Sequence, residues 1–144
     1  MSILNFFFIT LILFGVAYSV RWEFCDPNAD YKIRIESARI YPDPIKIGKN
    51  VLGVLNGTLL EEIDGGTLKI QLKYGGQPIY KIEDPICSAP QVFLCPHKPG
   101  FVSLSKTVPI PSFTPSGTYT GEVTIFDQNI EVVVCIKFTM DIMK

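Results

Sequence analysis

The chain has 144 residues, 47% of them hydrophobic, and its 13 Lys and Arg against 14 Asp and Glu leave a net charge of −1. This length suits one domain and is short for two independent cores. The balanced charge excludes the strongly basic surface typical of nucleic-acid-binding proteins. The apolar content excludes a largely disordered chain. We therefore expect one folded domain and no nucleic-acid partner.

Residues 1–19 contain no charged side chain and are mostly apolar. Their apolar run is short for a membrane span, which needs about 20 residues, and Ala17-Tyr18-Ser19 has the small-x-small pattern of a signal-peptidase site. The segment lacks the Lys or Arg that usually begins a signal peptide, so a buried N-terminal helix or a retained anchor is the alternative. We predict a secretory signal peptide at residues 1–19 and a mature domain at residues 20–144.

Four cysteines follow this leader: Cys25, Cys87, Cys95 and Cys135. Behind a signal peptide an even count indicates two disulfides, and four cysteines allow three pairings. Cys87 and Cys95 are close in sequence with Pro90 between them, which favours closure of a local loop. That pairing would leave Cys25 to join Cys135.

Alternation of apolar and polar residues predicts β-strands in most of the mature chain. Residues 67–74 alternate cleanly, with Leu68, Ile70 and Leu72 on one face, as in a half-buried antiparallel strand. Asp64-Gly65-Gly66 before it indicates a hairpin turn, and residues 51–60 are the expected partner strand.

Residues 31–41 also alternate, but the phase slips near Glu36 and Ser37, which predicts a β-bulge. Further strands are expected at 101–108, 118–126 and 130–140, the last after a turn at 127–129. A short strand at 79–82 is bounded by prolines. Six or seven antiparallel strands with regular turn signals predict an all-β sandwich or barrel, immunoglobulin-like in organisation.

Three stretches in a fixed order narrow this choice: residues 95–100 (CPHKPG), 108–119 (VPIPSFTPSGTY) and 135–139 (CIKFT). Over residues 22–140 the chain resembles the ML lipid-recognition family, above all its phosphatidylglycerol/phosphatidylinositol transfer proteins. The Niemann-Pick type C lysosomal sterol carrier belongs to the same family. Its branch has a third disulfide near the first strand, where this chain has YPDPIK at 41–46 and no cysteine. The difference favours the phospholipid branch and leaves a sterol ligand open.

The resemblance implies an immunoglobulin-like sandwich of about seven strands, with a lipid cavity between splayed sheets and the pairings Cys25–Cys135 and Cys87–Cys95. It implies a soluble monomeric carrier that binds phosphatidylglycerol or phosphatidylinositol and contacts membranes transiently during transfer. The expected location is extracellular or the endolysosomal lumen. Sterol transport in the same cavity, or a secreted recognition module without transfer activity, are the alternatives.

The resemblance also gives the inward-facing strand residues a second role as cavity wall instead of plain core. The expected wall residues are Leu68, Ile70, Leu72, Val132, Val134, Ile136 and Phe138. Alignment on the cysteines and the Pro-x-Pro stretch places the cavity mouth at Ile79 or Tyr80, at Ile110, and at Phe113 or Thr114.

Phe113 lies in a loop between Pro109 and Pro115, which restrict the backbone and hold an aromatic side chain at a rim. We predict a gate that touches the bilayer and admits lipid tails; a core plug under a loop is the alternative. Four lysines are weak candidates for contact with a lipid headgroup: Lys73, Lys81, Lys98 and Lys106.

Asn56-Gly57-Thr58 is an N-glycosylation sequon, and strand alternation sets Asn56 on the face opposite Leu55.

Evidence for catalysis is absent from the sequence pattern. The acidic run at 61–64 is typical of a solvated edge, and His97 lacks the nucleophile elbow and carboxylate of a hydrolase triad. His97 and four cysteines without a C-x-x-C pair also make a poor zinc site. We expect no enzymatic activity, no metal and no cofactor.

Overall fold

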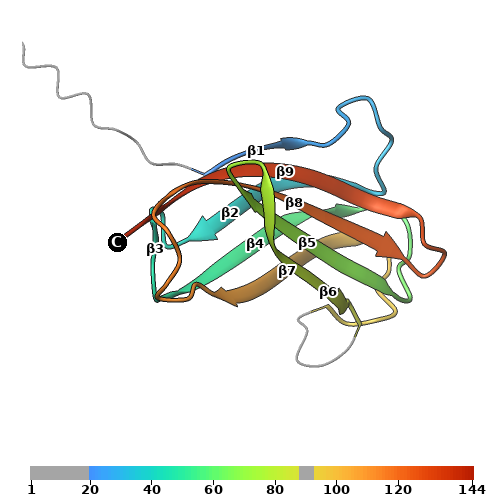
Figure 1. Cartoon of the computed structure of the whole chain (residues 1–144). Helices are drawn as coiled ribbons and strands as arrows, with labels where there is room; N and C mark the ends of the chain where they lie inside the picture. Colours follow the sequence, from blue (N-terminus) through green and yellow to red (C-terminus); the bar gives the residue numbers. More distant parts are fainter. Residues whose placement is uncertain (1–19, 88–92) are drawn as a thin grey trace, which may run out of the picture.

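The computed structural model describes residues 20–87 and 93–144, which form two β-sheets packed face to face (Figure 1). The larger sheet, called sheet A, has the order β1 (Arg21–Phe24), β9 (Val132–Met143), β8 (Gly117–Asp127), β5 (Gly66–Tyr74) and β6 (Gln77–Pro85). Sheet B has the order β2 (Ile33–Tyr41), β4 (Asn50–Leu59) and β7 (Gly100–Pro109). The two-residue β3 (Ile45–Lys46) pairs in parallel with the end of β9.

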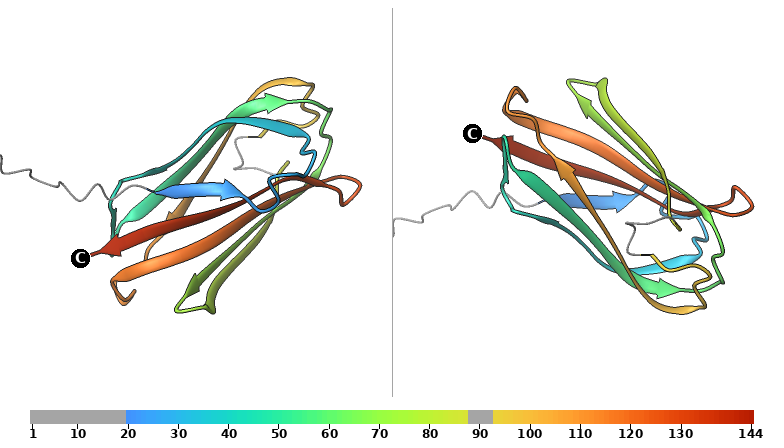
Figure 2. Two further views of the ribbon diagram at one scale, coloured as in Figure 1. Left: turned by 90° about the horizontal axis from the view of Figure 1, so that it is seen from above. Right: turned by 90° about the horizontal axis from the view of Figure 1, so that it is seen from below.

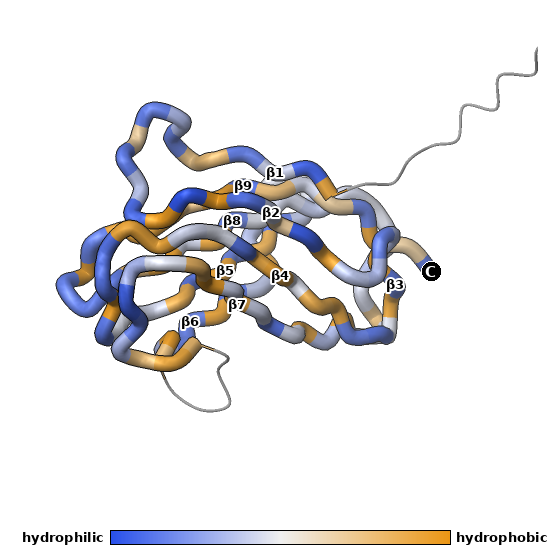
Figure 3. The backbone as a smooth tube through the Cα atoms, turned by 180° about the vertical axis from the view of Figure 1, so that it is seen from behind, coloured by the Kyte–Doolittle hydropathy of each residue, from blue (hydrophilic) through white to orange (hydrophobic). Residues whose placement is uncertain are grey.

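The all-β sandwich predicted from the sequence is confirmed, and all the predicted strands are present. β1 and β3 were not expected, because segments of four and two residues are too short to show a periodic pattern. Apolar and polar residues alternate along the strands (Figure 3). No helix among the described residues has the length and apolar character needed to cross a membrane. The predicted signal peptide lies outside the described residues.

The predicted hairpin between residues 51–60 and 67–74 is wrong. β4 lies between β2 and β7 in sheet B, whereas β5 lies between β6 and β8 in sheet A. The glycine that begins β5 has another role. Gly66 has φ 137°, and a Cβ there would come within 1.9 Å of the Phe126 carbonyl oxygen. Glycine is therefore required for the close approach of β5 to β8.

Register shifts in the β2–β4 and β8–β9 ladders change which residues face inward. The predicted slip in β2 is confirmed, because the pairing with β4 shifts between Ile35 and Ser37. A second shift, in the pairing of β8 with β9, was not predicted. It leaves Val133 almost fully buried and Val132 39% exposed, so the expectation that Val132 lies on the inward face is wrong.

The apolar core is divided into two clusters along the sandwich. One cluster lies towards the β8–β9 turn and includes Ile33, Leu59, Ile63 and Val134. The other lies towards the β7–β8 loop; it contains Ile45, Val51, Leu72, Ile110, Tyr119, Met140 and Ile142. Residues of both clusters, such as Leu55 and Leu72, also line a space between the sheets.

Aromatic side chains pack where the end of β1 comes close to the start of β2. Trp22 packs edge-on against Phe24 with ring centroids 5.5 Å apart, and Phe24 stacks on Tyr31 at 5.3 Å. The disulfide Cys25–Cys135 ties the end of β1 to β9. This pairing and the second disulfide, Cys87–Cys95, are those the resemblance implied.

A buried carboxylate fastens the end of the sandwich near the β8–β9 turn. Asp127 Oδ2 accepts a 2.8 Å hydrogen bond from Lys32 Nζ, and Oδ1 accepts bonds from the backbone N–H groups of Asn129 and Glu131. Lys32 also pairs with the carboxylates of Glu61 and Glu131. Burial opposes ionisation of Asp127, but the bonds from Lys32 and the two N–H groups hold its pKa below the ordinary 3.8. The bond to Asp127 raises the pKa of Lys32.

Replacing this carboxylate, as in Asp127→Asn, should lower the free energy of unfolding by about 2 kcal/mol at pH 7, because a charge-assisted bond to Lys32 is lost. The native pKa lies below the unfolded one, so the ionised carboxylate stabilises the protein above about pH 4. This contribution disappears as the pH falls through the native pKa. Urea unfolding of both proteins from pH 7 to pH 3 should show their difference shrinking with acidity. Glu122→Gln, at an exposed carboxylate on the same strand, is the control, and a pH-independent difference would contradict this explanation.

Candidate functional site: a cavity between the sheets

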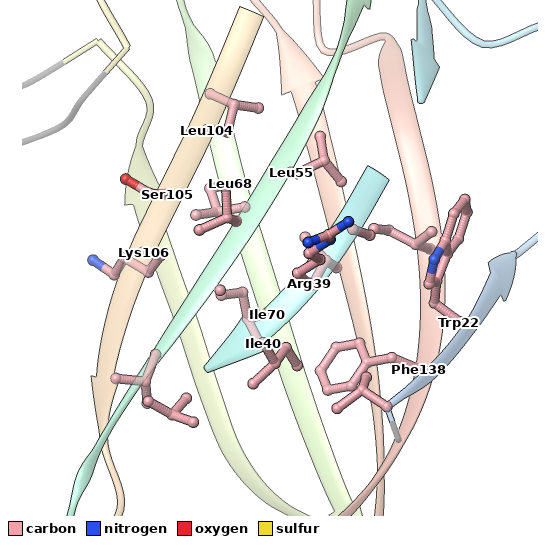
Figure 4. Close-up of a pocket in the computed structure, with 18 of the residues that line it drawn as sticks. Trp22, Arg39, Ile40, Leu55, Leu68, Ile70, Leu104, Ser105, Lys106 and Phe138 are labelled. Carbon is pink, nitrogen blue, oxygen red and sulfur yellow. The ribbon is translucent and has the colours of Figure 1, made fainter. Parts of the chain in front are cut away.

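An apolar cavity of about 170 Å³ lies between the two sheets. Side chains of both sheets line it, and Figure 4 shows Ile40, Ile70, Leu68 and Phe138 gathered from opposite sides. A cavity of about 150 Å³ lined by aliphatic and aromatic groups binds small apolar molecules in other proteins. The site therefore has the chemistry to hold hydrocarbon.

Seven of the eleven residues expected at the wall or mouth line this cavity: Leu68, Ile70, Leu72, Tyr80, Ile110, Ile136 and Phe138. The structure does not bring the other four to it. Val134 is fully buried within the core cluster near the β8–β9 turn, and Val132 is turned outward by the bulge. Ile79 and Phe113 are 50% and 86% exposed, outside the cavity.

The sequence reasoning missed the wall contributed by sheet B. It includes Ala38, Ile40, Val51, Gly53, Leu55 and Leu104. Alternation in residues 51–55 carried a usable signal, because Gly53 occupies the inward position between Val51 and Leu55. A Cβ at Gly53 would meet a single atom within 4 Å, the Lys106 carbonyl oxygen at 3.9 Å. The missing side chain therefore leaves free volume in the cavity.

A second glycine shapes the opposite wall. Gly121 on β8 lies beside Phe138 on β9, and a Cβ at Gly121 would come within 2.2 Å of the Phe138 ring. The ring therefore lies against the bare backbone of Gly121. With a side chain at position 121, Phe138 would have to move towards sheet B, into the cavity.

The proline-rich stretch forms the rim next to the cavity. Tyr119 is buried, and its hydroxyl donates a 2.6 Å bond to the Pro115 carbonyl oxygen, which pins the loop to β8. Burial, and then the neighbouring phenol of Tyr74, raises the pKa of Tyr119. Gly117, at φ 147°, passes close to the Tyr74 ring. The Pro-Ser-Gly-x-Tyr pattern is thus explained by loop anchoring.

Phe113 lies at the tip of the same loop. The Thr114 N–H donates to the Pro111 carbonyl oxygen and closes a tight four-residue turn, of which Phe113 is the third residue. Ile110, at the base, exchanges backbone bonds with Gly48 and Lys49 and is buried. The loop therefore combines a fixed base that lines the cavity with a projecting aromatic tip.

The cavity reaches the edge of the sandwich between β6 and β7. These strands end sheet A and sheet B respectively (Figure 2), and no backbone hydrogen bond joins them among the described residues. Tyr80, on β6, lines the cavity and is 42% exposed. The ion pair between Lys106 of β7 and Asp84 of β6 spans this opening, called the β6–β7 seam. Of the four candidate lysines, Lys106 lines the cavity; Lys73, Lys81 and Lys98 are exposed elsewhere.

Gly121→Ala should destabilise the protein by about 1–3 kcal/mol, because the added methyl overlaps the Phe138 ring and forces the core to shift. Phe138→Ala removes the overlapping ring, so the double variant should lose less stability than the two single changes together. Thermal unfolding of the four proteins measures this coupling. Strictly additive losses would show that Gly121 and Phe138 do not compete for the same space.

Comparison with known proteins adds the family to this geometry. A model of the ML domain family matches residues 19–142. The phosphatidylglycerol/phosphatidylinositol transfer protein of Aspergillus oryzae is 31% identical over 119 residues, covering 80% of this chain and 67% of that protein. A Dictyostelium discoideum protein, provisionally named as a transfer protein for the same two lipids, is 34% identical over 137 residues, covering 94% of this chain and 96% of the relative.

Solved structures give the same fold. A Niemann-Pick type C2 protein from the Japanese carpenter ant has a TM-score of 0.70 at 16% identity, covering 85% of this chain and 99% of that one. Chicken MD-1, solved in complex with lipid IVa, has a TM-score of 0.58 at 17% identity, covering 85% of this chain and 88% of that one. With its family match extending over almost the whole sequence, the chain belongs to the ML domain family.

Proposed function

We propose that the protein is a soluble carrier that binds a phospholipid, phosphatidylglycerol or phosphatidylinositol, between its two sheets and moves it between membranes. The observation that carries this proposal is the apolar cavity, which is lined by both sheets and reaches the β6–β7 seam. The names of the relatives from Aspergillus oryzae and Dictyostelium discoideum support the choice of lipid.

Burial of hydrocarbon is sufficient for this function without a chemical step. Exposing a sixteen-carbon tail to water costs about 12 kcal/mol at about 0.8 kcal/mol per CH₂. A protein wall that replaces water lowers this cost directly. A cavity of about 170 Å³ must widen to hold two such tails. Widening at the β6–β7 seam breaks no backbone ladder, so the sheets can separate there at modest cost.

The β7–β8 loop is the proposed membrane contact and gate. Phe113 projects from the loop tip, while Ile110 at its base lines the cavity. Ile79 and Tyr80, at the start of β6, are also half-exposed. Exposed apolar groups around an opening suit brief insertion into the bilayer surface, from which a tail can pass into the cavity.

The proposed compartment is extracellular or the endolysosomal lumen. Two disulfides fit an oxidising environment. Cleavage of the leader before Val20 is supported by the position of that residue: its backbone nitrogen lies 3.4 Å from Asp43 Oδ2. The α-ammonium created by cleavage would form an ion pair there.

We further propose that Asn56 is N-glycosylated and that the protein is a monomer. Asn56 lies on the face of β4 opposite Leu55, away from the cavity, and its side-chain amide donates to Ser37. A glycan there would project from the outer face of sheet B and leave the β6–β7 seam accessible.

Native mass spectrometry of the secreted protein, followed by lipid extraction, tests the function directly. One bound phosphatidylglycerol or phosphatidylinositol per chain is the expected result. A bound sterol would assign the cavity to sterol transport. If the protein carries no bound lipid and takes up none from labelled vesicles, the carrier function is contradicted and a secreted recognition module is favoured.

Gly53→Leu should fill the cavity from the central strand of sheet B. The position has free space around a Cβ, so we expect lipid uptake from vesicles to fall about tenfold or more while the melting temperature stays equal or rises. Ser103→Leu adds the same side chain to the outer face of β7 and should leave uptake unchanged. Normal uptake by a folded Gly53→Leu protein would show that lipid binds elsewhere.

Phe113→Asp should slow lipid transfer between vesicles about tenfold without changing the melting temperature, because it places a charge at the bilayer contact. Phe101→Asp is the matched control, since Phe101 is 66% exposed at the other end of β7. Transfer is followed by dequenching of a labelled phosphatidylglycerol. Equal transfer rates for the two variants would refute a specific membrane role for the β7–β8 loop.

A further inference from the structure

A lysine occupies one of the β7 positions that face the cavity. The other inward positions of the strand are apolar: Leu104 and Val108 line the cavity, as does Ile110 just beyond the strand, and Val102 is buried in the core. Lys106 follows the same alternation and lines the cavity. In Figure 4 its nitrogen points away from the gathered apolar side chains. The aliphatic part of Lys106 thus belongs to the wall, and its ammonium to the rim.

This ammonium meets a carboxylate of the opposite sheet across the seam. Lys106 Nζ lies 2.6 Å from Asp84 Oδ2, and the two side chains are 27% and 35% exposed. A partly exposed ion pair of this kind contributes little to stability. An apolar side chain at position 106 would continue the wall at least as well, so cohesion of the sheets does not account for the charge.

Both members of the pair keep hydrogen-bonding capacity for a ligand. An ammonium has three N–H donors, of which Asp84 occupies one, and a carboxylate has about four acceptor sites. Bonds from an ammonium to a phosphate are stronger than neutral ones. A diacyl lipid with its tails in the cavity carries its phosphate ester immediately outside the apolar part. At the β6–β7 seam that phosphate would reach Lys106.

We propose that Lys106 anchors the phosphate of the bound lipid, and that Asp84 holds the ammonium at the rim while accepting hydrogen bonds from headgroup hydroxyls. This assignment rests on the proposed carrier function, because it requires lipid tails in the cavity. It names the feature that is recognised: an anionic phosphate ester on a diacyl lipid. A diacylglycerol or a sterol offers the tails or rings without that group.

The test compares phosphatidylglycerol with a diacylglycerol of the same acyl chains, each with one fluorescent tail, titrated onto four proteins. Lys106→Gln should weaken phosphatidylglycerol binding about tenfold and leave diacylglycerol binding unchanged. Asp84→Asn keeps the anchor and should keep the preference for phosphatidylglycerol. Lys81→Gln removes the same charge from the outward face of β6 and should behave as the unchanged protein.

Two results of the Lys106→Gln titration overturn the assignment while leaving the carrier function intact. If Lys106→Gln weakens the binding of both lipids by the same factor, the ion pair acts as a latch between the sheets. If it changes the binding of neither lipid, the lysine has no part in binding. Glycerol 3-phosphate carries the same ester without tails and should not displace bound phosphatidylglycerol at equal concentration. Displacement would indicate a site for free phosphate esters and overturn the lipid assignment. If the unchanged protein binds neither labelled lipid, the proposed carrier function itself fails, and the role of Lys106 with it.

Discussion

The backbone hydrogen bonds of this sandwich stop at β6 in one sheet and at β7 in the other, and the site depends on that break. In a closed barrel these two strands would pair, and separating them would cost a full ladder of bonds. Here the sheets face each other across side chains alone, with the Lys106–Asp84 pair between the two rims. The space between them can therefore change in volume while each sheet keeps its own hydrogen bonds.

The opposite side of the sandwich is held together by stronger means. Phe24 of β1 stacks on Tyr31, just before β2, and the Lys32 N–H donates to the Val133 carbonyl oxygen of β9. Lys32 and Asp127 add a buried charge-assisted bond at one end. No ladder pairs β1 with β2 among the described residues, but the bonds of Lys32 to Val133 and Asp127 join the sheets there. We therefore expect opening at the β6–β7 seam, beside the loop that carries Phe113.

Glycines set the shape of the interior, each for a different reason. Gly66 permits close contact between β5 and β8, Gly121 gives room to the Phe138 ring, and Gly53 has open space where its side chain would be. The first two allow dense packing and the third prevents it. The residue type is the same in all three cases, so the different roles follow from the atoms that face each glycine.

The sequence by itself determined the seven longer strands, the bulge in β2, the inward face of β5 and the family, because alternation of apolar and polar residues and short motifs are local properties of the chain. Tertiary structure decided which strands pair: residues 51–60 and 67–74 read as a hairpin but lie in different sheets. It also decided which apolar residues are wall and which are core. Val134 and Ile136 are both buried aliphatic residues of β9, yet only Ile136 also lines the cavity. Cavity volume depends on the distance between two sheets, which no single segment encodes.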